Sequence, residues 1–336
     1  MIILIIEQWQ LLLTDAQNLM SNAFAAGTAA NLETQISGYK RFCEYFHITE
    51  ALPATPQILT AYITFLARSM KSQRSIQNYL SGVKMFHLLK GADHSAFGDL
   101  SVKLTMRGIG RTLCHTVKQA LPITPIILVS MLDWLDLDDP LDATYWALFL
   151  ICFFLFLRKS NIVPTSVRGF DAEKQFIRSD FQISKGVMLV NGKWSKTNQT
   201  GDRSGGLPVV SVTGSPLCPI VAFKRMCRLL PAPKSAPAFG MMKNGRYTVL
   251  TYSLFQAKLR VLLSAIGKNP SLYSTHSFRR GGASFAFQAG IPIELVKTLG
   301  DWRSDAYLRY LHMPLELRTD AARTFRTHLQ QELNMK

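Results

Sequence analysis

A histidine and an arginine three residues apart, followed by a tyrosine, are the residues of this chain whose types and spacing best suggest chemistry. His276 and Arg279 lie in a stretch that runs to Gly290, and its apolar spacing predicts a helix with a glycine stop. A spacing of three places both side chains on one helical face. There the guanidinium can grip two non-bridging oxygens of a phosphate, and the imidazole can donate to the same phosphate or move a proton.

The phenol of Tyr310, farther along the chain, could form the covalent bond that neither of those groups forms. A tyrosine oxygen that attacks a phosphodiester conserves the energy of the broken bond, so no metal or nucleotide is required. Tyr307 lies three residues earlier and is the alternative nucleophile. Five cysteines form no C-x-x-C pair and seven histidines are scattered, so we expect reduced thiols, no metal site and no cofactor.

Three short strings near the C-terminus resemble the final motif boxes of the tyrosine recombinases, also called phage-type integrases. They are H-S-F-R at 276–279, L-G-D-W at 299–302 and R-Y-L-H at 309–312, and the resemblance spans about residues 20–315. It implies a mainly α chain with a small β-sheet (α+β). In that fold a helical core-binding (SAM-like) domain, residues 1–115, precedes a catalytic domain, residues 116–336. It also implies metal-independent cleavage and rejoining of DNA through a covalent 3′-phosphotyrosine.

Two further catalytic positions of that family should lie upstream. The apolar run from Tyr145 to Leu157 leads into R-K-S-N-I, where Arg158 matches the family's first arginine. Lys196 lies between two β-like runs and matches the hairpin lysine that serves the family as general acid for the departing 5′ oxygen. The resemblance therefore implies a catalytic set that consists of Arg158, Lys196, His276, Arg279, Trp302 and Tyr310.

Two positions depart from the family's pattern. The family commonly has a carboxylate three residues after the first arginine, where this chain has Asn161, an amide without charge. The family's second His or Trp usually precedes the nucleophile by nine residues, whereas Trp302 precedes Tyr310 by eight and Asp301 by nine. We favour Trp302, because an indole N–H can donate to a phosphate oxygen and an ionised aspartate would repel it.

The charge of the chain suits a polyanionic partner such as double-stranded DNA. The formal net charge is +16, and both parts are basic: 11 Lys and Arg face 7 Asp and Glu before Ala120, which leaves 27 against 15 after it. A basic RNA-binding or ribosomal protein would share this charge, but would rarely be 48% hydrophobic. Candidates for phosphate contacts are Lys71, Arg74, Lys84 and Arg280, although a solvated helix face carries the same residue types.

Apolar spacing predicts N-terminal helices over 32–46, 56–68 and 75–87. Residues 105–121 are polar and basic and predict a linker, after which Thr124 caps a helix that Pro125 begins. A short β element is expected within about 167–212, and helices are expected to dominate from there to the end. The helix expected over 315–333 either docks into a neighbouring subunit of a synaptic tetramer on DNA or packs on its own domain.

The apolar N-terminus predicts a helix on the first domain or an extension without structure, because Glu7 interrupts it and no basic start or cleavage site marks a signal peptide. The run over 145–157 is shorter than the ~20 residues that cross a bilayer. We therefore expect a soluble, intracellular protein without a membrane partner. It would be nuclear if the source is eukaryotic, or in the cytoplasm or nucleoid if the source is bacterial.

Within the family, the chain is most similar to the Crypton- or DIRS-type recombinases of eukaryotic mobile elements. The strings behind this are R-K-S-N-I-V-P at 158–164, R-R-G-G-A at 279–283 and G-D-W-R-S-D-A-Y at 300–307. A Xer-like or phage integrase is the next choice. Two alternatives stay open: a domesticated DNA-binding regulator that does not cleave, and a type IB topoisomerase, which would relax any supercoiled DNA.

Overall fold

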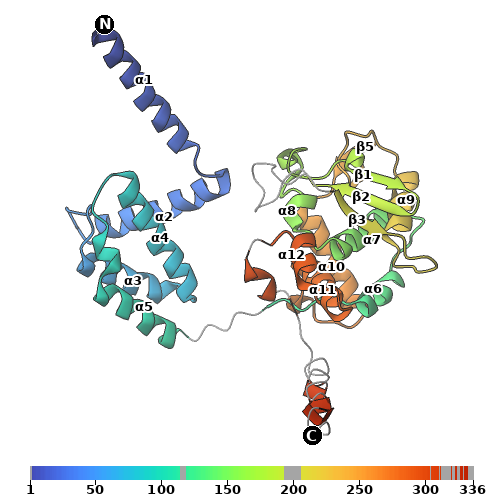
Figure 1. The fold of residues 1–336 in the computed structure, drawn as a ribbon. Coiled ribbons are helices and arrows are strands. Elements are labelled where there is room, and N and C mark those ends of the chain that lie inside the picture. Colours follow the sequence, from blue (N-terminus) through green and yellow to red (C-terminus); the bar gives the residue numbers. More distant parts are fainter. Residues whose placement is uncertain are drawn as a thin grey trace. The chain divides into compact units, whose positions relative to one another are not determined.

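The computed structural model describes residues 2–113, 119–192, 206–302, 304–309 and 311, and near the C-terminus 319, 322–323, 326–327 and 329–331. The chain divides into two compact units, Met1–Val117 and Lys118–Lys336 (Figure 1). The domain boundary predicted between residues 115 and 116 falls within 114–118, outside the described residues.

The described part of the N-terminal unit is helical. Its elements are α1 (Ile2–Ser21), α2 (Ala26–Tyr45), α3 (Pro56–Ser69), α4 (Gln73–Leu89), the 3-10 turn η1 (Ser95–Gly98) and α5 (Leu100–Thr112). Helices α2 to α5 pack around a core that includes Tyr39, Leu59, Tyr62 and Ile63, all of them fully buried. The three helices predicted from apolar spacing correspond to α2, α3 and α4.

The linker predicted over residues 105–121 was wrong in its first part, because residues 105–112 belong to α5. Asp99 caps this helix by accepting from the main-chain N–H of Ser101 at 2.7 Å. Val102 and Met106, four residues apart, are buried against the rest of the unit. The linker was predicted from the polar and basic residues of this stretch, which outnumber the few apolar residues of the helix.

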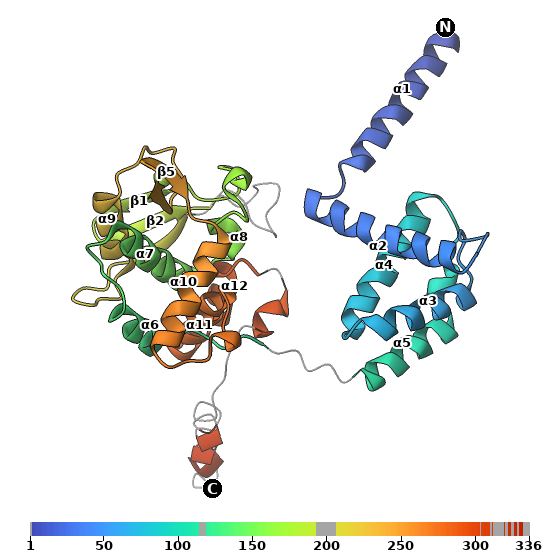
Figure 2. The ribbon, with the colours of Figure 1, turned by 180° about the vertical axis from the view of Figure 1, so that it is seen from behind.

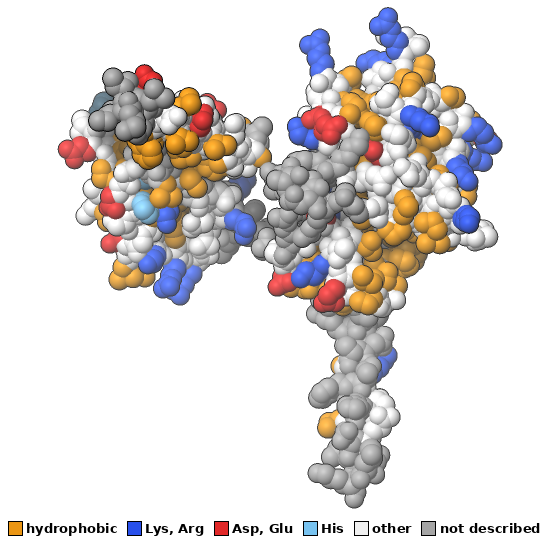
Figure 3. Space-filling view, turned by 45° about the horizontal axis from the view of Figure 1, so that its top comes forward, with side chains coloured by type: hydrophobic (Ala, Val, Ile, Leu, Met, Phe, Trp, Pro, Cys, Tyr) orange, Lys and Arg blue, Asp and Glu red, His pale blue; other side chains and the backbone are white. Residues whose placement is uncertain are grey.

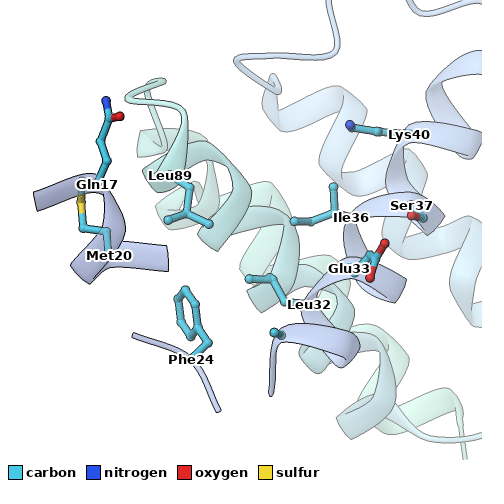
Figure 4. A pocket seen from close by; sticks show the side chains of 10 residues that line it. Gln17, Met20, Phe24, Leu32, Glu33, Ile36, Ser37, Lys40 and Leu89 are labelled. Atoms are coloured by element: carbon cyan, nitrogen blue, oxygen red, sulfur yellow. The ribbon is translucent and has the colours of Figure 1, made fainter. Parts of the chain in front are cut away.

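Helix α1 extends away from α2 in both ribbon views (Figures 1 and 2), and its described side chains, from Glu7 to Met20, are exposed. The N-terminus is therefore helical, as one of the two alternatives predicted, but the described side chains of this helix are exposed rather than packed on the first domain. Its last turn borders a groove of about 530 Å³, which Met20 and Phe24 line together with Leu32 and Ile36 of α2 (Figure 4). Of the predicted catalytic residues that the structure describes, none lines this groove.

The C-terminal unit combines helices with two small antiparallel sheets, β1-β2-β3 and β4-β5. Its helices are α6 (Pro125–Leu132), α7 (Pro140–Phe154), α8 (Lys159–Ile162), α9 (Pro219–Leu229), α10 (Tyr252–Ala265), α11 (His276–Gln288) and α12 (Ile293–Leu299). Its strands are β1 (Phe181–Ser184), β2 (Val187–Asn191), β3 (Gly206–Val210), β4 (Gly240–Lys243) and β5 (Arg246–Val249). The 3-10 turns are η2 (Val167–Gly169), η3 (Arg178–Asp180), η4 (Pro270–Leu272) and η5 (Asp305–Arg309).

Helix α7 forms the centre of this unit. It begins at Pro140, and Asp139 caps it by accepting from the main-chain N–H groups of Leu141 and Asp142. All residues from Ala143 to Phe153 are buried, as expected for a helix that is apolar on every side. In Figures 1 and 2, α9 and the strands lie on one side of α7, and α10, α11 and α12 on the other. No helix among the described residues is both long and apolar enough to span a bilayer.

The second sheet lies in the region after residue 212, where helices were expected to dominate, and no strand was predicted there. Strands β4 and β5 pair from Gly240 with Val249 to Lys243 with Arg246. The turn between them is Asn244-Gly245, with φ values of 51° and 73°. An Asn-Gly pair with both φ values positive is the strongest short hairpin signal, so this sheet could have been found in the sequence.

Two glycines let α11 lie unusually close to its neighbours. A Cβ atom on Gly281 would collide with the main-chain oxygen of Ile123, and one on Gly282 would collide with the main-chain oxygen of Phe153 and the ring of Phe156. The segment that contains Ile123 is also bound to α11 by a hydrogen bond from the Ile123 N–H to the Ser277 oxygen at 3.0 Å. The contact sets the position of His276 and Arg279 against the end of α7.

We predict that Gly282→Ala destabilises the C-terminal unit by about 1–3 kcal/mol, because the added methyl group has no room. Urea unfolding followed by tryptophan fluorescence measures this loss. Gly108→Ala is the control: nothing lies within 4 Å of that position in α5, and this substitution should not destabilise its unit. An unchanged unfolding midpoint for Gly282→Ala would show that α7 and α11 can separate at no cost.

Candidate active site

The end of α7 positions Arg158 through a left-handed turn. Leu155 ends the helix and Phe156 has a φ of 48°, while the Leu157 N–H bonds back to the Cys152 oxygen at 3.3 Å. This is the Schellman arrangement that commonly ends helices, here with a phenylalanine where glycine is usual. Arg158 then occupies the position just before α8. The apolar helix thus ends in a turn that brings a guanidinium to the edge of the core.

The end of α12 has the same construction. Gly300 ends the helix and Asp301 has a φ of 50°. The Asp301 N–H bonds to the Thr298 oxygen, and the Trp302 N–H bonds to the Lys297 oxygen, both at 3.0 Å. These two bonds fix the direction in which the side chains of Asp301 and Trp302 leave the helix.

Arg279 joins the two helix ends. Its Nη1 donates to the Phe156 oxygen, and its Nη2 donates to the Gly300 oxygen at 2.5 Å. The guanidinium lies over the ring of Trp302, with Cζ 3.9 Å from the ring centre, and the residue is only 2% exposed. A cation is favoured between two helix C-termini, where the partial charge is negative. Main-chain oxygens of the protein therefore bind both terminal nitrogens of Arg279 in this structure.

Trp302 closes a small apolar cluster over Arg279. The cluster also contains Phe156, Val296, Tyr307 and Leu311, and Trp302 itself is 7% exposed. The indole ring that we expected to face a phosphate is packed against the guanidinium instead. Tyr307, the alternative nucleophile, is 9% exposed in the same cluster, with its ring centre 6.5 Å from that of Trp302. Burial favours a packing role for Tyr307.

Arg158 contacts Asp301 twice. Its Nη1 donates to Oδ2 of Asp301 at 2.9 Å and its Nη2 to the main-chain oxygen of Asp301 at 3.0 Å. The two side chains are 16% and 26% exposed, so the pair lies at the surface of the unit rather than in its core. The structure therefore brings residues 158 and 301, which are 143 positions apart, into one site.

His276 stands at the start of α11 beside these arginines and is exposed. Its pKa is lowered from the ordinary value of 6.5, first by partial loss of hydration. The positive charge of Arg279 adds to this effect, followed by those of Lys159 and Arg158. The imidazole is consequently neutral at neutral pH and can accept a proton.

Lys159 belongs to the site although it was not among the predicted site residues. Its Nζ lies 3.5 Å from the centre of the Tyr252 ring, and its charge acts on His276. Its position directly after Arg158 was the available signal. Among the described residues, no group of three or more His, Cys, Asp or Glu side chains could hold a metal ion.

Lys196 and Tyr310 lie outside the described residues. The strands that flank the expected hairpin are present: β2 and β3 pair from Val187 with Val210 to Asn191 with Gly206. The helix predicted over 315–333 lies largely outside the described residues as well. The site that the structure describes therefore contains Arg158, His276, Arg279 and Trp302 of the predicted catalytic set.

The residues predicted to contact phosphates differ in their surroundings. Lys71, Arg74 and Lys84 are exposed on the N-terminal unit. Arg280 is half-buried, and its Nη1 donates to Oε1 of Gln119 at 2.7 Å and to the Ala120 oxygen at 3.2 Å. It therefore fastens the segment before α6 to α11. On the face drawn in Figure 3, Lys and Arg side chains are spread over each unit with hydrophobic side chains between them.

Solved structures share this fold. The Tn1549 transposon integrase in complex with transposon right end DNA matches with a TM-score of 0.59 and 12% identity, over 92% of this chain and 97% of that one. The XerH site-specific recombinase bound to a palindromic difH substrate matches with a TM-score of 0.53 and 15% identity, over 87% of this chain and 80% of that one. A lambda integrase dimer bound to a COC′ core site matches with a TM-score of 0.53 and 12% identity, over 90% of this chain and 94% of that one.

The chain therefore has the α+β fold of the tyrosine recombinases, and the predicted fold class is confirmed. At these identities the likeness establishes the fold alone. No protein-family model and no curated protein matches the sequence.

We predict that the imidazole of His276 titrates with a midpoint below 6.5, because lost hydration and three cations disfavour its protonated form. Since the folded-state pKa lies below the unfolded value, the contribution of His276 to stability is complete above pH 6.5 and is lost as the pH falls below it. NMR titration measures the midpoint. Lys159→Gln should raise it, whereas Lys268→Gln, at an exposed position after α10, should leave it unchanged. A midpoint at or above 6.5 in the unaltered protein would contradict the described surroundings.

Proposed function

We propose that this chain is a site-specific DNA recombinase that cleaves and rejoins strands through a covalent 3′-phosphotyrosine. The observation that carries the proposal is the meeting of Arg158, His276 and Arg279 at one place, from segments more than a hundred residues apart. His276 and Arg279 stand out by residue type and spacing and Arg158 by its resemblance to the family's first arginine, and all three lie together in this fold. The related structures contain recombinases and integrases bound to DNA, which supports DNA as the substrate.

In the proposed reaction, Arg158 and Arg279 bind the scissile phosphate and offset the charge that develops on its non-bridging oxygens. The oxygen of Tyr310 attacks phosphorus, and the bond from phosphorus to the 5′ oxygen breaks. Lys196 donates the proton that the departing 5′ hydroxyl needs. The 5′ hydroxyl of another strand then attacks the phosphotyrosine, releases Tyr310 and restores a phosphodiester. These two steps exchange one phosphate ester for another, so they require no oxidant, nucleotide or metal ion.

The lowered pKa of His276 suits this reaction. Tyrosine has an unperturbed pKa near 10, so the phenol must lose its proton to a base as it attacks. A neutral imidazole at the start of α11 can accept that proton, and neighbouring cations stabilise the phenolate. Trp302 would act as a further donor to the phosphate only after the turn at Gly300 moves, because its indole packs on the Arg279 guanidinium in this structure.

Access to Arg279 sets a condition on the mechanism. Its guanidinium is 2% exposed beneath Trp302, whereas Arg158 and His276 reach the surface. Direct contact between Arg279 and a phosphate therefore requires the turn at Gly300 to move. The same observation supports a second candidate function, a domesticated DNA-binding regulator that does not cleave, in which Arg279 is a structural residue.

The wider assignment follows from the same proposal. The motif strings favour a Crypton- or DIRS-type mobile element as the source, with integration or excision of that element as the task and the nucleus as its place. Lys71, Arg74 and Lys84 would grip the DNA backbone from the N-terminal unit, with Arg280 as a further candidate contact. The segment 315–333 would join subunits in a synaptic tetramer.

We predict that the unaltered protein forms an adduct with DNA that survives denaturation, and that Tyr310→Phe forms none while still binding DNA. The substrates are nicked duplexes from a library of candidate element ends, since a nick prevents religation and traps the covalent species. Denaturing gels detect the adduct, and digestion identifies its 3′-phosphate link.

Tyr307→Phe is the matched control. It removes one phenol three residues away, in a side chain that is buried in the Trp302 cluster, and the adduct should persist. An adduct in Tyr310→Phe, or its loss in Tyr307→Phe alone, would overturn the assignment of the nucleophile. DNA that is bound by the unaltered protein but never becomes covalent would favour the regulator.

A further inference from the structure

A carboxylate from a distant segment fixes the orientation of Arg158. Asp301 accepts from Nη1 with its side chain at 2.9 Å and from Nη2 with its main chain at 3.0 Å. A guanidinium is planar, so two bonds from its two terminal nitrogens define both its place and its plane. Charge-assisted bonds of this kind are about twice as strong as neutral ones.

Asp301 is itself held by contacts that do not involve Arg158. It occupies the left-handed position after α12, where its N–H bonds to Thr298 at 3.0 Å. The preceding carbonyl, that of Gly300, accepts from the buried Arg279 at 2.5 Å. The carboxylate is therefore presented by a turn that the core of the unit defines, and Arg158 is oriented against it.

The side chain three residues after Arg158, which is the next helical neighbour of Arg158 along the chain, carries no charge. Asn161 lies three residues later in α8, its N–H bonds to the Arg158 oxygen at 3.0 Å, and it is 7% exposed. Residues three apart on a helical turn lie side by side, so this position faces the same side as Arg158. An amide supplies no charge there, and the carboxylate that pairs with Arg158 comes from Asp301 instead.

We propose that Asp301 is a positioning residue, whose carboxylate orients Arg158 for the scissile phosphate and supplies the charge that Asn161 lacks. The inference rests on the proposed function, because the phosphate is the ligand for which Arg158 is oriented. A guanidinium has five N–H donors, so the two bonds to Asp301 leave donors for a phosphate. Asp301 touches no substrate in this role and acts through Arg158.

The test is Asp301→Gly, because glycine suits the left-handed turn better than aspartate and removes the carboxylate without strain. We expect thermal stability to be kept and DNA binding not to weaken. The rate of adduct formation in a single turnover should fall about 10- to 100-fold. Rotation of the Arg158 guanidinium, measured by NMR on protein with labelled arginine, should become faster.

Adding Asn161→Asp to Asp301→Gly returns a carboxylate three residues from Arg158. Most of the lost rate should return, and rotation of the guanidinium should slow again. A residue that merely stabilised the turn would not be rescued from a different segment. Asp305→Asn is the control for charge: Asp305 is 76% exposed and lies 3.4 Å from Lys297, and its loss should change neither readout.

Other outcomes overturn the inference. Unchanged rotation of Arg158 in Asp301→Gly would show that Asp301 does not orient it. Faster cleavage, together with tighter DNA binding, would show that Asp301 competes with the phosphate. If the unaltered protein forms no adduct, the proposed function fails, and the rotation measurement still decides separately whether Asp301 holds Arg158.

Discussion

The buried guanidinium of Arg279 is the contact on which the rest of the site depends. A charge that has lost its water must be paired or hydrogen-bonded, and Arg279 meets this need with carbonyls from the ends of two helices, those of Phe156 and Gly300. Both carbonyls are presented by left-handed turns. Removing the guanidinium would leave the ends of α7 and α12 facing each other with like partial charges.

The residues that reach the surface follow directly from those two turns. Arg158 comes two residues after Phe156, and Asp301 comes immediately after Gly300. The two carbonyls that Arg279 binds in the core are therefore followed in the chain by the two side chains that pair at the surface. His276 joins them because it lies one helical turn before Arg279 on α11. One buried residue therefore sets the places of three surface groups, and the close packing at Gly281 and Gly282 keeps α11 where this is possible.

The sequence indicated which residues matter better than how they are arranged. Helix α7 was evident from its apolar run and α11 from its spacing. His276 and Arg279 were evident from their residue types and spacing, and Arg158 from the resemblance of its turn to a motif of the tyrosine recombinases. The bond between Arg158 and Asp301 spans 143 positions and has no local signal, so Asp301 was weighed only as a rival of Trp302. The packing of Trp302 on Arg279 was unexpected because an indole N–H suggests a ligand, whereas the ring face suits a cation. Strands β4 and β5 were missed although Asn244-Gly245 marks their turn.

The most direct test of the account asks whether Arg158 acts on the charge of the phosphate. Duplexes carrying a neutral methylphosphonate at the scissile position would be compared with ordinary duplexes, for the unaltered protein and for Arg158→Ala. The account predicts that Arg158→Ala slows adduct formation about 10²- to 10³-fold on the charged phosphate and much less on the neutral one, because the lost group has little charge left to offset. Equal losses on both substrates would show that Arg158 supports the structure alone and would contradict the account.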